Sequence, residues 1–177
     1  MSPETPVRFL LDTEYCLALI RLRPAHLEPV FAGFAPGEIG VSSLTVAALQ
    51  ERAQQSRAPQ RNRRALEQFL LPLAIVDFDT AAATLLGRIA GELTPQALAP
   101  ASHTLLLAAQ ASSLNATLIT PHPERYAAVD ELSVNAGAGA ALAVLDTAPG
   151  ACAEADPAGT IYAFGSHDVT LDLLDEL

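Results

Sequence analysis

The sequence has no lysine and only two cysteines, Cys16 and Cys152, which lie far apart in its 177 residues. Two distant cysteines make neither a disulfide framework nor a recognisable pair of metal ligands, so we expect idle thiols in a reducing compartment. No uncharged apolar run reaches the roughly 18 residues that a membrane-spanning helix needs. The first residues also lack the order of a signal peptide. We therefore expect a soluble, cytoplasmic protein.

Basic residues are absent from the C-terminal quarter of the chain. Residues 130–177 contain nine acidic residues and no basic one, whereas residues 1–129 contain eleven acidic residues and all ten arginines. The formal net charge of −10 therefore belongs mainly to the last 48 residues. With 50% hydrophobic residues, the chain is far from the composition of disordered or collagen-like sequences. We expect a nearly neutral globular body followed by an acidic segment.

The body alternates predicted strands with predicted helices. Short apolar runs predict strands at 7–12, 38–42, 73–78, 116–120 and 132–135. Periodic segments predict helices at 13–20, 26–34, 43–54, 61–71, 80–93 and 102–114, with a short helix from Pro123. This alternation predicts an α/β fold with a parallel sheet and helices on both faces. Ligands of such sheets bind outside the carboxyl ends of the strands, where Asp12, Ser42 and Thr120 lie.

The segment beyond residue 135 has a different character. A Gly/Ala stretch at 136–143 and a loop rich in Ala, Pro and acidic residues at 147–159 predict an appendage of modest order. Within it, we expect a strand at 159–165 and an acidic helix at 168–177. We expect an ordered domain followed by an acidic extension.

Four groups of residues, in this order and spacing, resemble one known family. They are Leu11–Thr13, Val41–Leu49, Val76–Ala83, and Leu107–Ala111 followed by Asn115–Thr120. Together they resemble the PIN domain, specifically the VapC-like ribonuclease toxins of toxin–antitoxin pairs. The resemblance implies a PIN-like domain at 5–135, built as a three-layer αβα sandwich with a mainly parallel central sheet. It also implies a homodimer, an antitoxin-like protein partner, and cleavage of RNA with Mg²⁺ or Mn²⁺. It says nothing about the acidic C-terminal extension, 136–177.

The acidic site that this resemblance implies is depleted. The family's first carboxylate corresponds to Asp12, which is present and is the predicted catalytic residue. The other acidic positions correspond to Ala48, Thr104 and His122. Mg²⁺ needs several hard oxygen ligands, so one remaining carboxylate favours a degenerate relative that binds RNA or a protein partner without cutting.

The alternative is an active, metal-dependent endoribonuclease with unconventional ligands. Glu51 lies one helical turn beyond Ala48 on the same face, and Glu14 follows Asp12 by two positions. The predicted metal ligands on this alternative are Asp12, Glu51 and His122. A second version combines Asp12 with His103 and His122, a donor set suited to Mn²⁺, Fe²⁺ or Zn²⁺.

A cluster of arginines is the candidate binding surface for RNA. Its members are Arg52, Arg57, Arg61, Arg63 and Arg64. Guanidinium groups match phosphate oxygens, although the same pattern is typical of a solvated helix face. No aromatic residue interrupts the cluster, so stacking of bases is not expected. We also consider that the acidic extension folds back and occupies this cluster.

Overall fold

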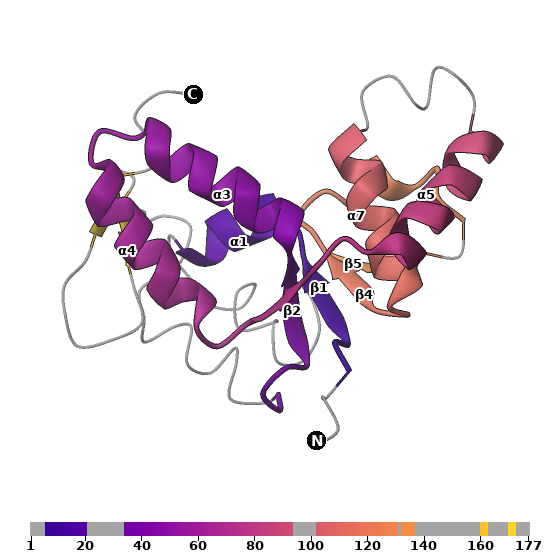
Figure 1. Ribbon diagram of the computed structural model, residues 1–177, viewed down its shortest axis with the longest axis horizontal. Helices are drawn as coiled ribbons and strands as arrows, with labels where there is room; N and C mark the ends of the chain where they lie inside the picture. The colour runs from indigo at the N-terminus through magenta and orange to yellow at the C-terminus, as the bar shows by residue number, and fades with distance from the viewer. Residues whose placement is uncertain are drawn as a thin grey trace.

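The computed structural model describes residues 6–20, 34–93, 102–130 and 132–136, and the backbone of two short strands at 160–162 and 170–172 (Figure 1). The strands are β1 (Phe9–Leu11), β2 (Ile39–Ser42), β3 (Ala74–Val76), β4 (Thr117–Ile119), β5 (Val134–Asn135), β6 (Thr160–Tyr162) and β7 (Thr170–Asp172). The helices are α1 (Thr13–Ile20), α3 (Ser43–Gln55), α4 (Pro59–Leu70), α5 (Thr80–Glu92), α7 (Ser102–Ser113) and the 3₁₀ helix η1 (Pro123–Tyr126). The helix predicted at 26–34 falls on residues that, apart from Phe34, lie outside the described ranges.

The central sheet has five strands in the order β3-β2-β1-β4-β5, and every pair in it is parallel. Leu11 at the end of β1 lies between Val41 of β2 and Ile119 of β4. The chain builds the sheet outward from β1 to β3 and then returns to the other side of β1 with β4. The order therefore reverses between β1 and β4, and such a reversal is where open α/β sheets bind ligands.

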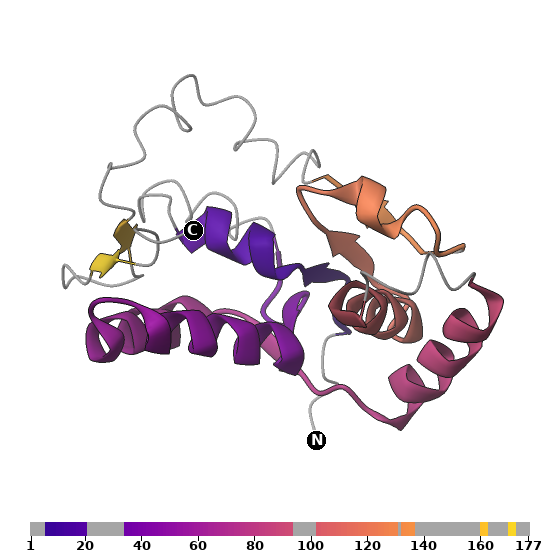
Figure 2. The same ribbon diagram turned by 90° about the horizontal axis from the view of Figure 1, so that it is seen from above.

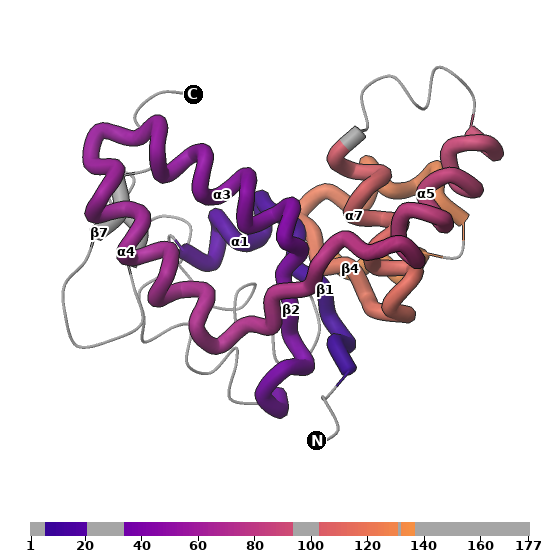
Figure 3. Tube along the Cα trace, in the orientation of Figure 1, coloured from indigo at the N-terminus to yellow at the C-terminus, as the bar shows by residue number. Residues whose placement is uncertain are grey.

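Two buried cores lie on opposite faces of the sheet, because successive strand residues point to opposite sides. Leu11 belongs to the core formed with α1, α3 and α4, which contains the fully buried Phe69. Its neighbour Leu10 belongs to the core formed with α7 and η1, which contains Leu118 and Tyr126. Figure 2 shows helices on both sides of the sheet, and Figure 3 traces the chain from α4 across to α5. These layers confirm the predicted αβα sandwich.

Local capping residues explain where several helices begin. The side chain of Ser42 accepts a hydrogen bond from the backbone N–H of Leu44, and that of Asp79 accepts one from Ala82, so both are N-caps. The helix predicted from Arg61 starts earlier, at Pro59. Proline fits the first turn of a helix, because the N–H that it lacks has no partner there. Pro59 therefore opens α4 instead of preceding it.

The end of the chain contains a strand where a helix was predicted. β6 lies within the predicted strand 159–165 and pairs antiparallel with β7. Because β7 is a strand at Thr170–Asp172, the acidic helix predicted over 168–177 is wrong there. Thr160, Ile161 and Thr170 are β-branched and favour strands. Acidic residues near a helix C-terminus also oppose the helix dipole. The backbone of both strands lies beside α4 (Figure 1).

Among the described helices, none combines the length and the apolar character needed to cross a bilayer.

Candidate functional site at the carboxyl edge of the sheet

Asp12 and Thr120 meet at the point where the strand order reverses. Asp12 follows β1, and its backbone N–H donates to the carbonyl of Ile119 at 2.9 Å. Thr120 follows β4, and its hydroxyl Oγ1 donates to Oδ2 of Asp12 at 2.7 Å. Both side chains are buried, with exposed fractions of 5% and 0%. The backbone carbonyl of Asp12 also accepts a hydrogen bond from the N–H of Cys16 in α1. The backbone of Asp12 is therefore fixed by the sheet and by α1, and Thr120 holds its carboxylate.

Two further groups with ionisable protons lie close to the Asp12 carboxylate. Burial raises the pKa of the Tyr126 phenol well above its usual value, and the charge of Asp12 and a hydrogen bond with it add to that rise. Burial, together with the charge of Asp12, also raises the pKa of the Cys16 thiol. Both groups stay protonated at neutral pH. Cys16 is consequently an inert core thiol, because only the thiolate is reactive.

A compact ion-pair network lies beside Asp12. The guanidinium of Arg125 contacts Oε1 of Glu14 at 2.7 Å, and Nε2 of His122 contacts Oε2 of the same carboxylate at 2.8 Å. The other ring nitrogen of His122 lies 3.1 Å from Glu124. Three of these residues follow β4 closely, in the loop after it and in η1, while Glu14 belongs to the first turn of α1. We call these four residues the Glu14–Arg125 network.

The electrostatics of this network favour charged Glu14 and charged Arg125. Partial burial alone would raise the pKa of the Glu14 carboxyl, but the hydrogen bond and the charge of Arg125 outweigh it. The pKa of Glu14 therefore lies below its usual value. In return, the hydrogen bond and charge of Glu14 raise the pKa of Arg125, and the charge of Asp12 adds to this rise. Arg125 therefore contacts Glu14 directly and lies within the electrostatic field of Asp12.

The predicted metal ligands occupy different environments. Glu51 is exposed and accepts a hydrogen bond from Gln55 at 3.2 Å. His103 is exposed at the start of α7, with Nε2 3.3 Å from Oγ1 of Thr13. His122 pairs with Glu14 and Glu124. In the part of the chain that the structure describes, no three His, Cys, Asp or Glu side chains form a group that could hold a metal ion.

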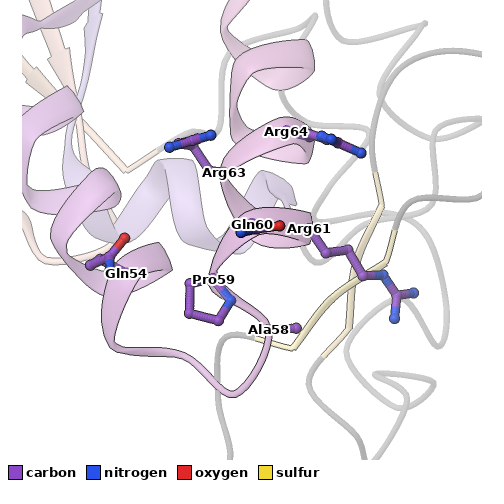
Figure 4. A pocket seen from close by; sticks show the side chains of 7 residues that line it. All are labelled: Gln54, Ala58, Pro59, Gln60, Arg61, Arg63 and Arg64. Atoms are coloured by element: carbon purple, nitrogen blue, oxygen red, sulfur yellow. The ribbon is translucent and has the colours of Figure 1, made fainter.

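The arginine cluster is divided between two helices. Arg57, Arg61, Arg63 and Arg64 are exposed, and they lie in α4 or just before it. Arg61, Arg63 and Arg64 line an open pocket of about 930 Å³. Figure 4 shows Arg61 and Arg64 pointing to the same side, whereas Arg63 points away from them. Arg63 lies 3.7 Å from Glu67.

Arg52 is separate from this group. It lies half-buried in α3, and its charge contributes to lowering the pKa of Glu14. The arginines exposed on α4 therefore form one candidate surface, and Arg52 belongs with the site at the sheet edge.

Sequence reasoning identified Asp12 and weighed Glu14 and His122, but it missed Thr120 as the partner of Asp12 and missed Arg125 and Tyr126 altogether. One signal was available, because Glu124, Arg125 and Tyr126 follow closely on the polar end of a buried strand. In parallel sheets, residues just after a strand lie at the carboxyl edge, where ligands bind.

Comparison with known proteins gives a consistent family. The PIN domain family matches residues 9–132. A tRNA(fMet)-specific endonuclease VapC from Shigella flexneri is 30% identical over 126 residues, which cover 71% of this chain and 95% of the relative. A ribonuclease VapC2 from Haemophilus influenzae is 33% identical over 114 residues, covering 64% of this chain and 86% of the relative. The solved structure of DNA-bound VapBC from Salmonella typhimurium is similar with a TM-score of 0.66 at 27% identity, covering 73% of this chain and 97% of that chain.

The fold and the site define an α/β protein with an aspartate at the switch point of an all-parallel sheet. The chain belongs to the PIN domain family, in its VapC-like branch. The resemblance seen in the sequence is thereby confirmed.

The residues present fit a divalent cation poorly. PIN-domain VapC ribonucleases generally depend on a divalent metal. Mg²⁺ requires near-octahedral coordination by oxygen ligands, yet Ala48, Thr104 and His122 stand at the positions that the family resemblance assigns to acidic residues other than Asp12. Asp12 is already hydrogen-bonded by Thr120, and Glu14 already contacts Arg125 and His122. The donor set of this chain therefore does not match the group that the family uses.

Proposed function

We propose that this chain is a VapC-like PIN protein that has lost metal-dependent cleavage of RNA and acts by binding. The observation that carries the proposal is the environment of Asp12. Its carboxylate accepts a hydrogen bond from Thr120, and the carboxylate of Glu14, two residues further along the chain, forms an ion pair with Arg125. Metal-dependent hydrolysis needs a cation that turns water into a nucleophile and neutralises developing charge. In this arrangement the Asp12 carboxylate, which follows β1, is instead hydrogen-bonded to Thr120 after β4 and to Tyr126 in η1.

A cleavage assay tests the loss of activity. We expect that RNA incubated with the purified protein and Mg²⁺ or Mn²⁺ is cut no faster than with Asp12→Asn, which keeps the shape of the side chain and removes its charge. Parallel reactions with EDTA measure any contaminating nuclease, and both single-stranded and structured RNA serve as substrates. Metal-dependent cutting that disappears in Asp12→Asn would overturn the proposal. It would favour the active alternative, in which Asp12 works with Glu51 or Glu14, or with His103 and His122.

RNA is the partner that the exposed surface of α4 favours. Arg61 and Arg64 extend to the same side of the helix (Figure 4), and Arg57 is also exposed. Guanidinium groups so arranged can contact successive phosphates, and each contact releases counterions. Arg63 pairs with Glu67 and Arg52 lies by the site, so we assign them a smaller part in binding.

Salt dependence measures this surface directly. For the double variant Arg61→Gln, Arg64→Gln, we expect weaker binding of single-stranded RNA at low salt. We also expect the slope of log K against log salt to become shallower by about 1.4, since each phosphate contact contributes roughly 0.7. Arg8→Gln, Arg88→Gln is the matched control, because it also removes two exposed arginines and both lie outside α4. Equal losses in both variants would mean that net charge, and not the α4 surface, governs binding.

An antitoxin-like protein is the second candidate partner. It is favoured by a specific observation, because the similar solved VapBC structure from Salmonella typhimurium is a toxin–antitoxin complex. We propose that the domain at 5–135 carries these binding functions and that 136–177 is an acidic extension to it. The homodimer that the family implies and the cytoplasmic location expected from the composition stay predictions, and light scattering measures the first.

A further inference from the structure

We infer that Arg125 is a built-in counter-ion, which takes over at this sheet edge the role of a bound cation and thereby keeps divalent metal out. The inference rests on the proposed function and extends it, because it names what replaced the metal. Two basic side chains converge on one carboxylate, with Arg125 on Oε1 of Glu14 and His122 on Oε2. Both oxygens of Glu14 are therefore occupied by groups of the chain itself.

The position of Arg125 distinguishes it from an ordinary surface ion pair. Isolated surface pairs contribute little, because solvent screens them. Arg125 is half-exposed, but it feels the charge of Asp12 as well as that of Glu14. Asp12 is buried at the switch point, where the field of a carboxylate is screened less than at the surface. A positive charge held there compensates two carboxylates at once.

The local sequence explains how the guanidinium reaches this place. The chain leaves β4 at Thr120 and makes the short helix η1, in which Tyr126 is buried in the core. Burial of Tyr126 and its hydrogen bond with Asp12 anchor the helix, so that the preceding residue, Arg125, lies at the carboxyl edge. A cation at that position repels a second, divalent cation at short range. Arg125 thus opposes metal binding in addition to occupying a carboxylate.

Removal of the guanidinium provides the test. In Arg125→Gln, Asp12 and Glu14 lose their compensating charge, and we expect the protein to bind Mn²⁺ at least about tenfold more tightly than the natural chain. We also expect its melting temperature to be lower without metal and to recover when Mn²⁺ is added. Arg125→Lys keeps the charge and should behave like the natural chain. Electron paramagnetic resonance of free Mn²⁺ counts the bound ions, and adding Asp12→Asn to Arg125→Gln should abolish the gain.

The matched control is another ion-paired arginine outside the site. Arg8 contacts Glu38 at 2.8 Å, close to the 2.7 Å of the pair between Arg125 and Glu14. Arg8→Gln should change the melting temperature little and should create no affinity for Mn²⁺. The inference is overturned if Arg125→Gln folds but binds no more Mn²⁺ than Arg8→Gln, or if the natural chain binds Mn²⁺ as tightly as Arg125→Gln. These outcomes are separate from the cleavage assay, which alone decides whether the natural chain is a nuclease.

Discussion

Restoring two carboxylates in one chain, with Ala48→Glu and Thr104→Asp, should create Mg²⁺-dependent cleavage of RNA that we propose the natural chain lacks. Ala48 lies half-buried in α3, which directly follows β2, the neighbour of β1. Thr104 lies half-buried in the first turn of α7. These are the positions where the family resemblance places acidic residues beside Asp12. A bound cation contributes several kcal/mol to such hydrolysis, and each 1.4 kcal/mol is about tenfold in rate. We therefore expect a gain of about a hundredfold or more.

The control for this gain is the pair Ala48→Gln, Thr104→Asn, which has the same shape without the charges. Cleavage should appear only in the acidic pair, should need Mg²⁺ or Mn²⁺, and should vanish when Asp12→Asn is added. Because Arg125 opposes a divalent cation, adding Arg125→Gln to the acidic pair should raise its activity further. If the acidic pair is folded by circular dichroism and still cuts no faster than the amide pair, the missing carboxylates do not explain the loss.

The fold was largely predictable because its signals are local. Alternation of apolar runs with periodic segments indicated the strands and helices, and the length of the connections indicated a parallel sheet. The errors also have local causes. Pro59 is compatible with the first turn of a helix as well as with a break before it, and the β-branched residues near Thr170 favoured a strand over the acidic helix.

The site was predictable only in part because its contacts are distant in sequence. Asp12 was recognisable as a carboxylate ending a buried strand. Its partner Thr120 lies 108 positions away, and Glu14 and Arg125 are separated by 111. These contacts depend on β4 pairing with β1, and the strand order cannot be read from periodicity. The expected acidic positions directed attention to missing carboxylates, whereas the structure shows an arginine, Arg125, paired with Glu14 at the same edge of the sheet.

The acidic extension should compete with RNA for the arginines of α4. Residues 136–177 carry no basic residue, and the backbone of β6 and β7 lies beside α4. A segment tethered in this way has an effective local concentration on the order of millimolar. Weak contacts with the arginines are then enough to lower the affinity for RNA. Neutralising the extension with Asp168→Asn, Asp172→Asn and Asp175→Asn should strengthen RNA binding about five- to tenfold at low salt.

Ionic strength and a matched variant separate this competition from a simple change of net charge. The control neutralises three exposed acidic residues of the body, with Asp77→Asn, Glu92→Gln and Asp130→Asn, and changes the net charge equally.

Competition should weaken at high salt, because the Debye length falls to about 3 Å at 1 M. The tighter RNA binding of the variant with the neutralised extension should therefore shrink there. Deleting 136–177 should give the same increase at low salt. An equal gain in the control would assign the effect to net charge, and no gain in either the neutralised or the deleted chain would mean that the extension does not cover the α4 arginines.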